Sequence, residues 1–165
     1  MAISGVTKNF RDGTLAIEDG TGTPISMTLA YEDGDFSISG LGESQKEVAK
    51  YEDRGDFYCA RKTKTKYPQF KFTAHFTDLH DATEKTLLGV AKKIGAWSAG
   101  VSTLGANAEV WAVKLTWTIE GSNHGDAADH VLILDDCIIT DFGVSEGDPN
   151  KFTITGEVLG TITPS

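Results

Sequence analysis

Four side chains of the kind that bind metal ions lie close together in the sequence: His124, Asp126, Asp129 and His130. Imidazole nitrogens and carboxylate oxygens at such short spacing can ligate a divalent cation. The segment that carries them contains a glycine and two alanines, and it lacks a helical pattern that would fix the ligand geometry. We therefore interpret it as a connection between strands and keep a metal-dependent enzyme as the weaker hypothesis.

Other motifs of catalysis and nucleotide binding are missing from the sequence. There is no Gly-x-Ser-x-Gly nucleophile elbow and no Gly-x4-Gly-Lys phosphate loop. Residues 39–42 are rich in glycine but do not open a helical pattern. Neither Cys59 nor Cys137 has a histidine partner suggested by the sequence, and we expect both to be buried free thiols, with a disulfide between them as the alternative. These observations predict a protein that is not an enzyme and holds no cofactor.

The composition is typical of one soluble globular domain over residues 1–165, with 39% hydrophobic and 24% charged residues. No apolar run predicts a secretory signal or a membrane span, so we expect synthesis in a cytoplasm and no membrane partner. The formal net charge is -9. Adhesive nucleic-acid binding needs a positive surface, so the charge argues against it. The charge is compatible with a surface that nucleic acid passes without sticking.

Three segments alternate apolar and polar residues with a period of two, which indicates half-buried strands. They span residues 69–77, 110–120 and 151–162. Within residues 130–142, the runs 131–134 and 137–139 are apolar on both parities, and Asp135 and Asp136 lie between them. Such a segment is typical of a strand covered on both faces, here with a neighbouring subunit as one cover, or of a coil or bulge at the aspartates.

Shorter alternating runs fill the N-terminal third, before Asp19-Gly20 and again before Asp33-Gly34. Asp-Gly pairs supply the positive φ that tight hairpin turns need, so this region predicts a meander of short antiparallel strands. One helix is expected over residues 82–94. Asp81 and Glu84 have the spacing of a capping box, and Gly95 can end the helix. The whole pattern predicts a mainly β fold: an antiparallel β-sandwich or barrel with one flanking helix.

Residues 40–68 are charged and poorly periodic, and we interpret them as a solvated hairpin or as an arm that pairs with a partner. The residues expected to contact another subunit through this arm are Glu43, Lys46, Glu47, Tyr51, Asp53, Arg54 and Asp56.

A series of short motifs follows this order of elements along nearly the whole chain: Gly13-Thr14-Leu15, Asp19-Gly20-Thr21-Gly22, Asp53-Arg54-Gly55, Pro68-Gln69-Phe70-Lys71-Phe72, Phe76-Thr77-Asp78 and Phe152-Thr153-Ile154-Thr155-Gly156. In their order they resemble the major tail tube proteins of long-tailed bacteriophages. The tubes of contractile tails and of type VI secretion systems share that fold, so the resemblance does not select one machine.

The resemblance implies a small β-sandwich whose copies close into rings of six, which stack through the N-terminal segment and the arm. Such a tube belongs to the virion tail and is assembled in the host cytoplasm. It holds a tape-measure protein, meets terminator and distal tail proteins, and conducts double-stranded DNA without reading its sequence. The residues expected to line the lumen or the outer face are Lys114, Thr116, Thr118, Lys151, Thr153, Thr155 and Glu157.

A second hypothesis of another class is a monomeric β-sandwich that binds carbohydrate or a protein partner. An aromatic platform for sugars would expose tryptophan rings. Trp111 and Trp117 share the apolar side of an alternating segment, and Trp97 follows the expected helix, so we expect these rings in the core or an interface.

Overall fold

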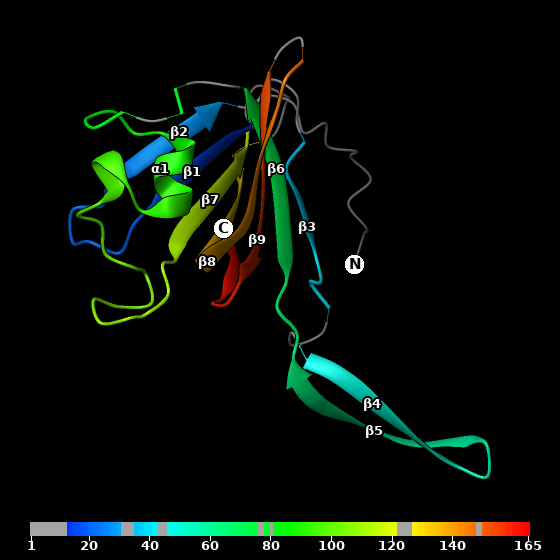
Figure 1. The fold of residues 1–165 in the computed structure, drawn as a ribbon. Helices are drawn as coiled ribbons and strands as arrows, with labels where there is room; N and C mark the ends of the chain where they lie inside the picture. Colours follow the sequence, from blue (N-terminus) through cyan, green and yellow to red (C-terminus); the bar gives the residue numbers. More distant parts are fainter. Residues whose placement is uncertain are drawn as a thin grey trace.

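The computed structural model describes residues 13–30, 35–42, 46–75, 78–79, 81–121, 127–147 and 150–165. These residues form a mainly antiparallel β fold with one short α-helix (Figure 1). None of the helices within the described ranges is long and apolar enough to cross a membrane. The strands are β1 (Thr14–Glu18), β2 (Ser26–Ala30), β3 (Ser37–Ser39), β4 (Lys46–Asp53), β5 (Asp56–Thr65), β6 (Gln69–His75), β7 (Val113–Ile119), β8 (His130–Ser145), β9 (Lys151–Val158) and β10 (Ile162–Pro164).

Eight strands share one sheet in the order β2-β1-β7-β8-β9-β6-β3, with β10 beside β8. β4 and β5 form a separate two-stranded sheet. The N-terminal meander predicted from the sequence is confirmed for β1 and β2 and is wrong for β3. β1 and β2 pair with each other, but β3 pairs with β6 at the opposite edge of the sheet. Asp33-Gly34 lies outside the described residues.

The long strand β8 joins the two halves of this sheet. Its first half pairs with β7 and its second half with β9, and the register with β7 shifts between Leu134 and Cys137. Asp135 and Asp136 form the resulting bulge, with Asp136 in the left-handed region at φ 53°. A bulge bends its strand, so β8 can pass from one half of the sheet to the other. The bulge expected at the two aspartates is therefore confirmed.

The segment 151–162 was expected to be one strand, and this expectation is wrong. β9 ends at Val158, and β10 starts at Ile162 beside the first half of β8. The break lies against the β8 bulge, where Leu159 N–H donates to Asp136 O at 3.0 Å and Gly160 N–H donates to Asp135 O at 3.2 Å. These bonds replace the regular ladder and turn the chain toward β10.

The core lies between the two halves of the sheet. Phe36, next to β3, meets Trp117 of β7 with ring centroids 4.7 Å apart, although their strands lie far apart in the sheet order. This contact across the fold confirms the antiparallel sandwich predicted from the alternating segments. The buried apolar residues of the core are Leu15, Ile17, Phe36, Phe70, Phe72, Leu87, Val90, Trp97, Val113, Leu115, Leu134, Cys137, Phe152, Ile154 and Val158.

The helix is shorter than residues 82–94. Asp81 Oδ1 accepts N–H bonds from Thr83 and Glu84, which closes a local turn and does not start the helix. α1 (Leu87–Lys92) begins after Thr86, whose Oγ1 accepts the Gly89 N–H at 3.1 Å. The prediction failed at this end because an Asx turn and a helix cap share one sequence signature.

The C-terminal end of α1 is also set by local geometry. Lys93 adopts the left-handed region at φ 54°, and Ile94 N–H returns to Gly89 O at 3.1 Å. Gly95, at φ 59°, then opens the short 3-10 helix η2 (Gly95–Trp97). The left-handed cap expected at Gly95 is thus formed by Lys93, and η2 brings Trp97 into the core.

Asp19 does not make the tight hairpin turn that its Asp-Gly pair suggests. Its buried carboxylate accepts N–H bonds from Ile25 at 2.7 Å and Val101 at 3.0 Å, and the Thr21 hydroxyl at 2.9 Å. Burial alone would raise the pKa of Asp19, but these hydrogen bonds together hold it below its ordinary value. Gly20 is required for close approach, because a Cβ there would press against Ser102 O.

Asp19→Ala is expected to lower the free energy of unfolding by about 3 kcal/mol, because it leaves two N–H groups without acceptors. The folded pKa is depressed, so the contribution is complete above the ordinary pKa of 3.8 and is lost as the pH falls through the folded value. Urea unfolding at pH 7 and at acid pH measures both effects. Thr23→Ala, an exposed change in the same loop, is the matched control. An equal loss of unfolding free energy in the two variants would contradict the role of Asp19.

Candidate assembly surfaces

The most exposed element is the hairpin of β4 and β5, which we call the arm (residues 46–65). Figure 1 shows it extending away from the sheet. Its two-residue turn consists of Arg54 at φ 51° and Gly55 at φ 89°, the type I′ combination that matches strand twist. The hairpin form of the charged segment is therefore confirmed.

Most of the residues predicted to act through the arm lie on it. Lys46, Glu47, Tyr51 and Asp53 belong to β4, Arg54 is in the turn, and Asp56 begins β5, whereas Glu43 lies outside the described residues. Their contact with another subunit stays a prediction.

The arm also carries apolar rings that the sequence interpretation did not select. Phe57 is 68% exposed and Tyr58 is 75% exposed, beside Tyr51 at 49%. A two-stranded hairpin has no core of its own and is at best marginally stable in water. Two aromatic residues next to a tight turn in a charged hairpin could have been recognised as exposed, because a hairpin tip seldom reaches a core. Exposed rings on a hairpin without a core suggest a partner surface.

The base of the arm is tied to the sheet. β5 leads into β6 through residues 66–68, and Pro68 O accepts the Val158 N–H at 2.9 Å. Gly40, at φ 85°, lies so close that a Cβ would be 3.3 Å from Pro68 Cα. The two chain segments that enter and leave the arm thus meet at a fixed point.

The residues expected to line a lumen or an outer face lie on the polar faces of β7 and β9, which point away from the core. On β7, Lys114, Thr116 and Thr118 alternate with the buried Val113 and Leu115. On β9, Phe152, Ile154 and Val158 are buried, and the alternating residues point away from the core: Lys151, Thr153, Thr155 and Glu157. Lys114 Nζ forms an ion pair with Glu18 Oε2 of the neighbouring strand β1 at 3.1 Å. Which space these polar faces border stays a prediction.

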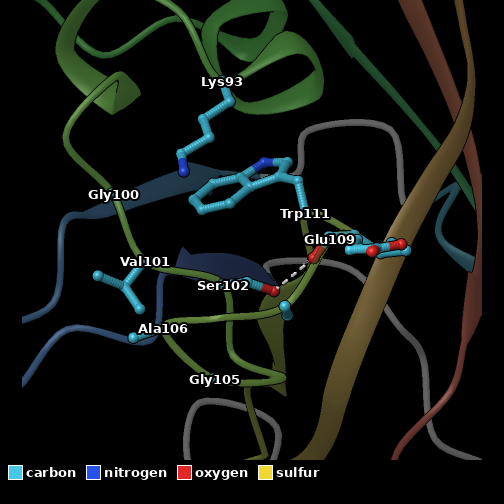
Figure 2. Close-up of a pocket in the computed structure, with 10 residues that line it drawn as sticks. Lys93, Gly100, Val101, Ser102, Gly105, Ala106, Glu109 and Trp111 are labelled. Atoms are coloured by element: carbon cyan, nitrogen blue, oxygen red, sulfur yellow. Dashed lines mark hydrogen bonds between the residues drawn. The ribbon is translucent and has the colours of Figure 1, made fainter.

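A small pocket lies beside α1 (Figure 2). It has a volume of about 130 Å³ and is lined by Lys93, residues 100–102, 105–106 and 108–110, and Trp111. Lys93 Nζ lies over the Trp111 ring, 5.1 Å from its centroid, and Trp111 Nε1 donates to Val90 O at 2.7 Å. Ligand sites usually have about 300–1,000 Å³, so this pocket is small for a sugar or cofactor.

The tryptophans are largely where the sequence predicts them. Trp97 is fully buried, and Trp111 and Trp117 are partly buried and packed against the core. Since Lys93 covers one face of Trp111, that ring is not an open platform for sugar stacking.

Two of the four candidate metal ligands, Asp129 and His130, lie within the described residues. His124 and Asp126 lie outside the described residues. Asp129 Oδ1 accepts the Gly121 N–H at 3.1 Å, and His130 begins β8. Among the residues that the structure describes, no group of three or more His, Cys, Asp or Glu side chains is arranged to hold a metal ion.

Both cysteines are free thiols, but only one is buried. Cys137 lies in the core, and burial is the main cause of its raised pKa. Cys59 is half-exposed, because β5 belongs to the arm and not to the sandwich. The expected burial of Cys59 is therefore wrong.

Three comparisons with known proteins bear on this fold. No protein-family model matches the sequence. No curated protein matches it either. Solved structures do match: the chain has the fold of tube-associated proteins of contractile injection systems, which agrees with the resemblance drawn from the sequence at the level of fold.

Three of these structures illustrate the likeness. A chain of the PVC sheath/tube terminator in the extended state, from an extracellular contractile injection system, matches with a TM-score of 0.58 and 12% identity over 99% of both chains. A chain of the PVC sheath-tube complex matches with a TM-score of 0.55 and 12% identity, over 99% of this chain and 93% of that chain. A chain of the anti-feeding prophage tube terminating cap matches with a TM-score of 0.56 and 10% identity, over 100% of this chain and 94% of that chain.

Proposed function

We propose that this protein is a structural subunit of a phage-like tail tube. Copies close into rings of six, and the rings stack into a tube through the arm. The observation that carries this proposal is the arm itself, a hairpin without a core that projects from the sandwich and exposes Tyr51, Phe57 and Tyr58. Such a surface is stabilised when another subunit covers it. The fold shared with chains of sheath-tube assemblies supports the same conclusion.

The proposed lumen holds a tape-measure protein during assembly and later conducts double-stranded DNA. The net charge of -9 supports this, because a negative wall repels phosphates and lets DNA slide. The polar faces of β7 and β9 are rich in threonine, which suits a hydrated wall. Terminator and distal tail proteins are the proposed partners at the two ends of the tube. The particle is a virion tail assembled in the host cytoplasm, and the subunit itself catalyses no reaction.

A tube terminator is the second candidate. The likeness to chains in a sheath/tube terminator structure and a tube cap structure favours it. In this role the chain would form a ring that ends the stack and does not extend it, so the two candidates differ in the final assembly.

Negative-stain electron microscopy of the purified chain, over a range of concentrations and beside light scattering, tests the proposal. We expect rings with a central channel that stack into tubes as the concentration rises. Single rings that never stack would support the terminator instead. A monomer at every concentration would contradict both and favour the monomeric binding module.

A further inference from the structure

The arm and the rest of the chain differ in the sign of their charge. The arm and the residue that follows it, residues 46–66, contain seven basic and four acidic residues, whereas the remainder contains eight basic and twenty acidic residues. The acidic residues of the arm gather at its tip, at Glu52, Asp53 and Asp56, and the cations concentrate toward its base. A basic strip therefore projects from an acidic body.

Three of the cations near the base of the arm are not neutralised within the described part of the chain. Arg61, Lys64 and Lys66 are exposed and make no ion pair with any described residue. Lys46 Nζ donates only to a neutral group, Thr65 Oγ1, at 2.7 Å. Free cations along a projecting hairpin favour a negatively charged partner surface.

A groove at the β8 bulge is a concave, acidic feature of the body. It has a volume of about 440 Å³, and Asp19, Asp135 and Asp136 contribute carboxylates to its lining. Its cation, Lys114, is already paired with Glu18 at 3.1 Å. Carboxylates therefore outnumber free cations in the groove.

The three carboxylates of the groove differ in their partners. Asp19 is held by loop N–H groups, and Asp135 Oδ2 accepts the Thr161 hydroxyl at 2.9 Å. The Asp136 carboxylate makes no hydrogen bond or ion pair with a described residue. It lies on the bulge, half-buried at the side of the groove. Asp136 is thus the carboxylate best placed to accept a cation from outside.

We propose that the arm of one copy docks into the acidic groove at the β8 bulge of another copy. The positively charged end of the arm next to the sheet makes this contact, with Lys64 and Lys66 facing Asp136. The arm extends away from its own sheet, so the occupant is the arm of a second copy (Figure 1). The inference rests on the proposed assembly through the arm. Arm and groove are different surfaces, so the contact is head-to-tail and can be repeated from copy to copy. Association is consequently weakened by salt.

Charge reversal and charge exchange in the full chain test this docking. Lys64→Glu with Lys66→Glu, and separately Asp136→Lys, are each expected to weaken association at least about tenfold by light scattering and sedimentation velocity. The chain that combines all three changes is expected to recover most of the loss. Lysine fits the backbone at position 136, because Arg54 and Lys93 adopt the same left-handed conformation in this chain. Circular dichroism confirms that each variant is folded.

Lys92→Glu, an exposed reversal at the end of α1, is the matched control and is expected to leave association unchanged. The docking is overturned if either reversal leaves association unchanged, or if the combined chain fails to recover while the variants remain folded. In that case tubes formed by the unchanged chain still support the proposed function. An unchanged chain that stays monomeric overturns the function and the docking together.

Discussion

A chain in which residues 46–65 are replaced by a short Gly-Ser link is expected to stay folded and to lose tube formation. No residue of β4 or β5 belongs to the core, so the sandwich keeps its buried contacts. Gly40 and Pro68 approach each other closely, so a link of a few residues closes the gap without strain. We expect the free energy of unfolding to change by less than about 1 kcal/mol. Association is expected to fall by roughly a hundredfold or more, because exposed aromatic residues often dominate an interface.

Sedimentation velocity measures the loss of association, and electron microscopy measures the loss of tubes. A milder variant, Phe57→Ser with Tyr58→Ser, keeps the hairpin and removes its two most exposed rings. Its matched control is Leu104→Ser with Val110→Ser, since these side chains are 43% and 48% exposed but lie far from the arm in the chain. Tubes of normal length from the shortened chain would show that the arm is not an assembly element.

Gly156→Ala is expected to destabilise the sandwich by about 3 kcal/mol or more. Gly156 lies on β9 between β8 and β6, where a Cβ would overlap both Ile138 O and the Phe70 ring. Neither obstacle can move freely: one is ladder backbone and the other is a fully packed core side chain. The substitution therefore forces the two central strand pairings apart.

Thermal and urea unfolding measure this effect, and Gly143→Ala on β8 is the matched control. A Cβ at Gly143 meets nothing closer than Thr153 Cβ at 3.8 Å, so we expect a change of less than about 0.5 kcal/mol. Similar stabilities for the two alanine variants would mean that β8 and β6 can separate at Gly156 at little cost.

The strands were predictable where one face is buried along their whole length. β6, β7 and the first part of the 151–162 segment alternate strictly, because each packs one side on the core. The break between β9 and β10 was not predictable. It depends on the β8 bulge, whose hydrogen bonds to Leu159 and Gly160 come from a distant part of the chain. Local alternation contains no information about such a contact.

The helix start and the arm illustrate two other limits. The signature at Asp81 and Glu84 was read as a helix cap, but only the tertiary burial of Leu87 and Val90 decides where α1 begins. In the arm, the many charged residues correctly predicted an exposed element and its position in the chain. Phe57 and Tyr58 were overlooked because aromatic residues are normally assigned to a core, and the distance of this hairpin from the sandwich is a three-dimensional property.

The continuity of β5 with β6 has a mechanical consequence. A pull on the arm enters the sheet through Pro68 and acts along β6, whose seven register pairs with β9 run at right angles to the strand. The ladder is then loaded in shear, so its hydrogen bonds share the tension and do not break one after another. A hairpin that is weak by itself is thus anchored along a full strand ladder, and in the proposed assembly a force between neighbouring subunits would be spread over the β6–β9 pairing of each sandwich.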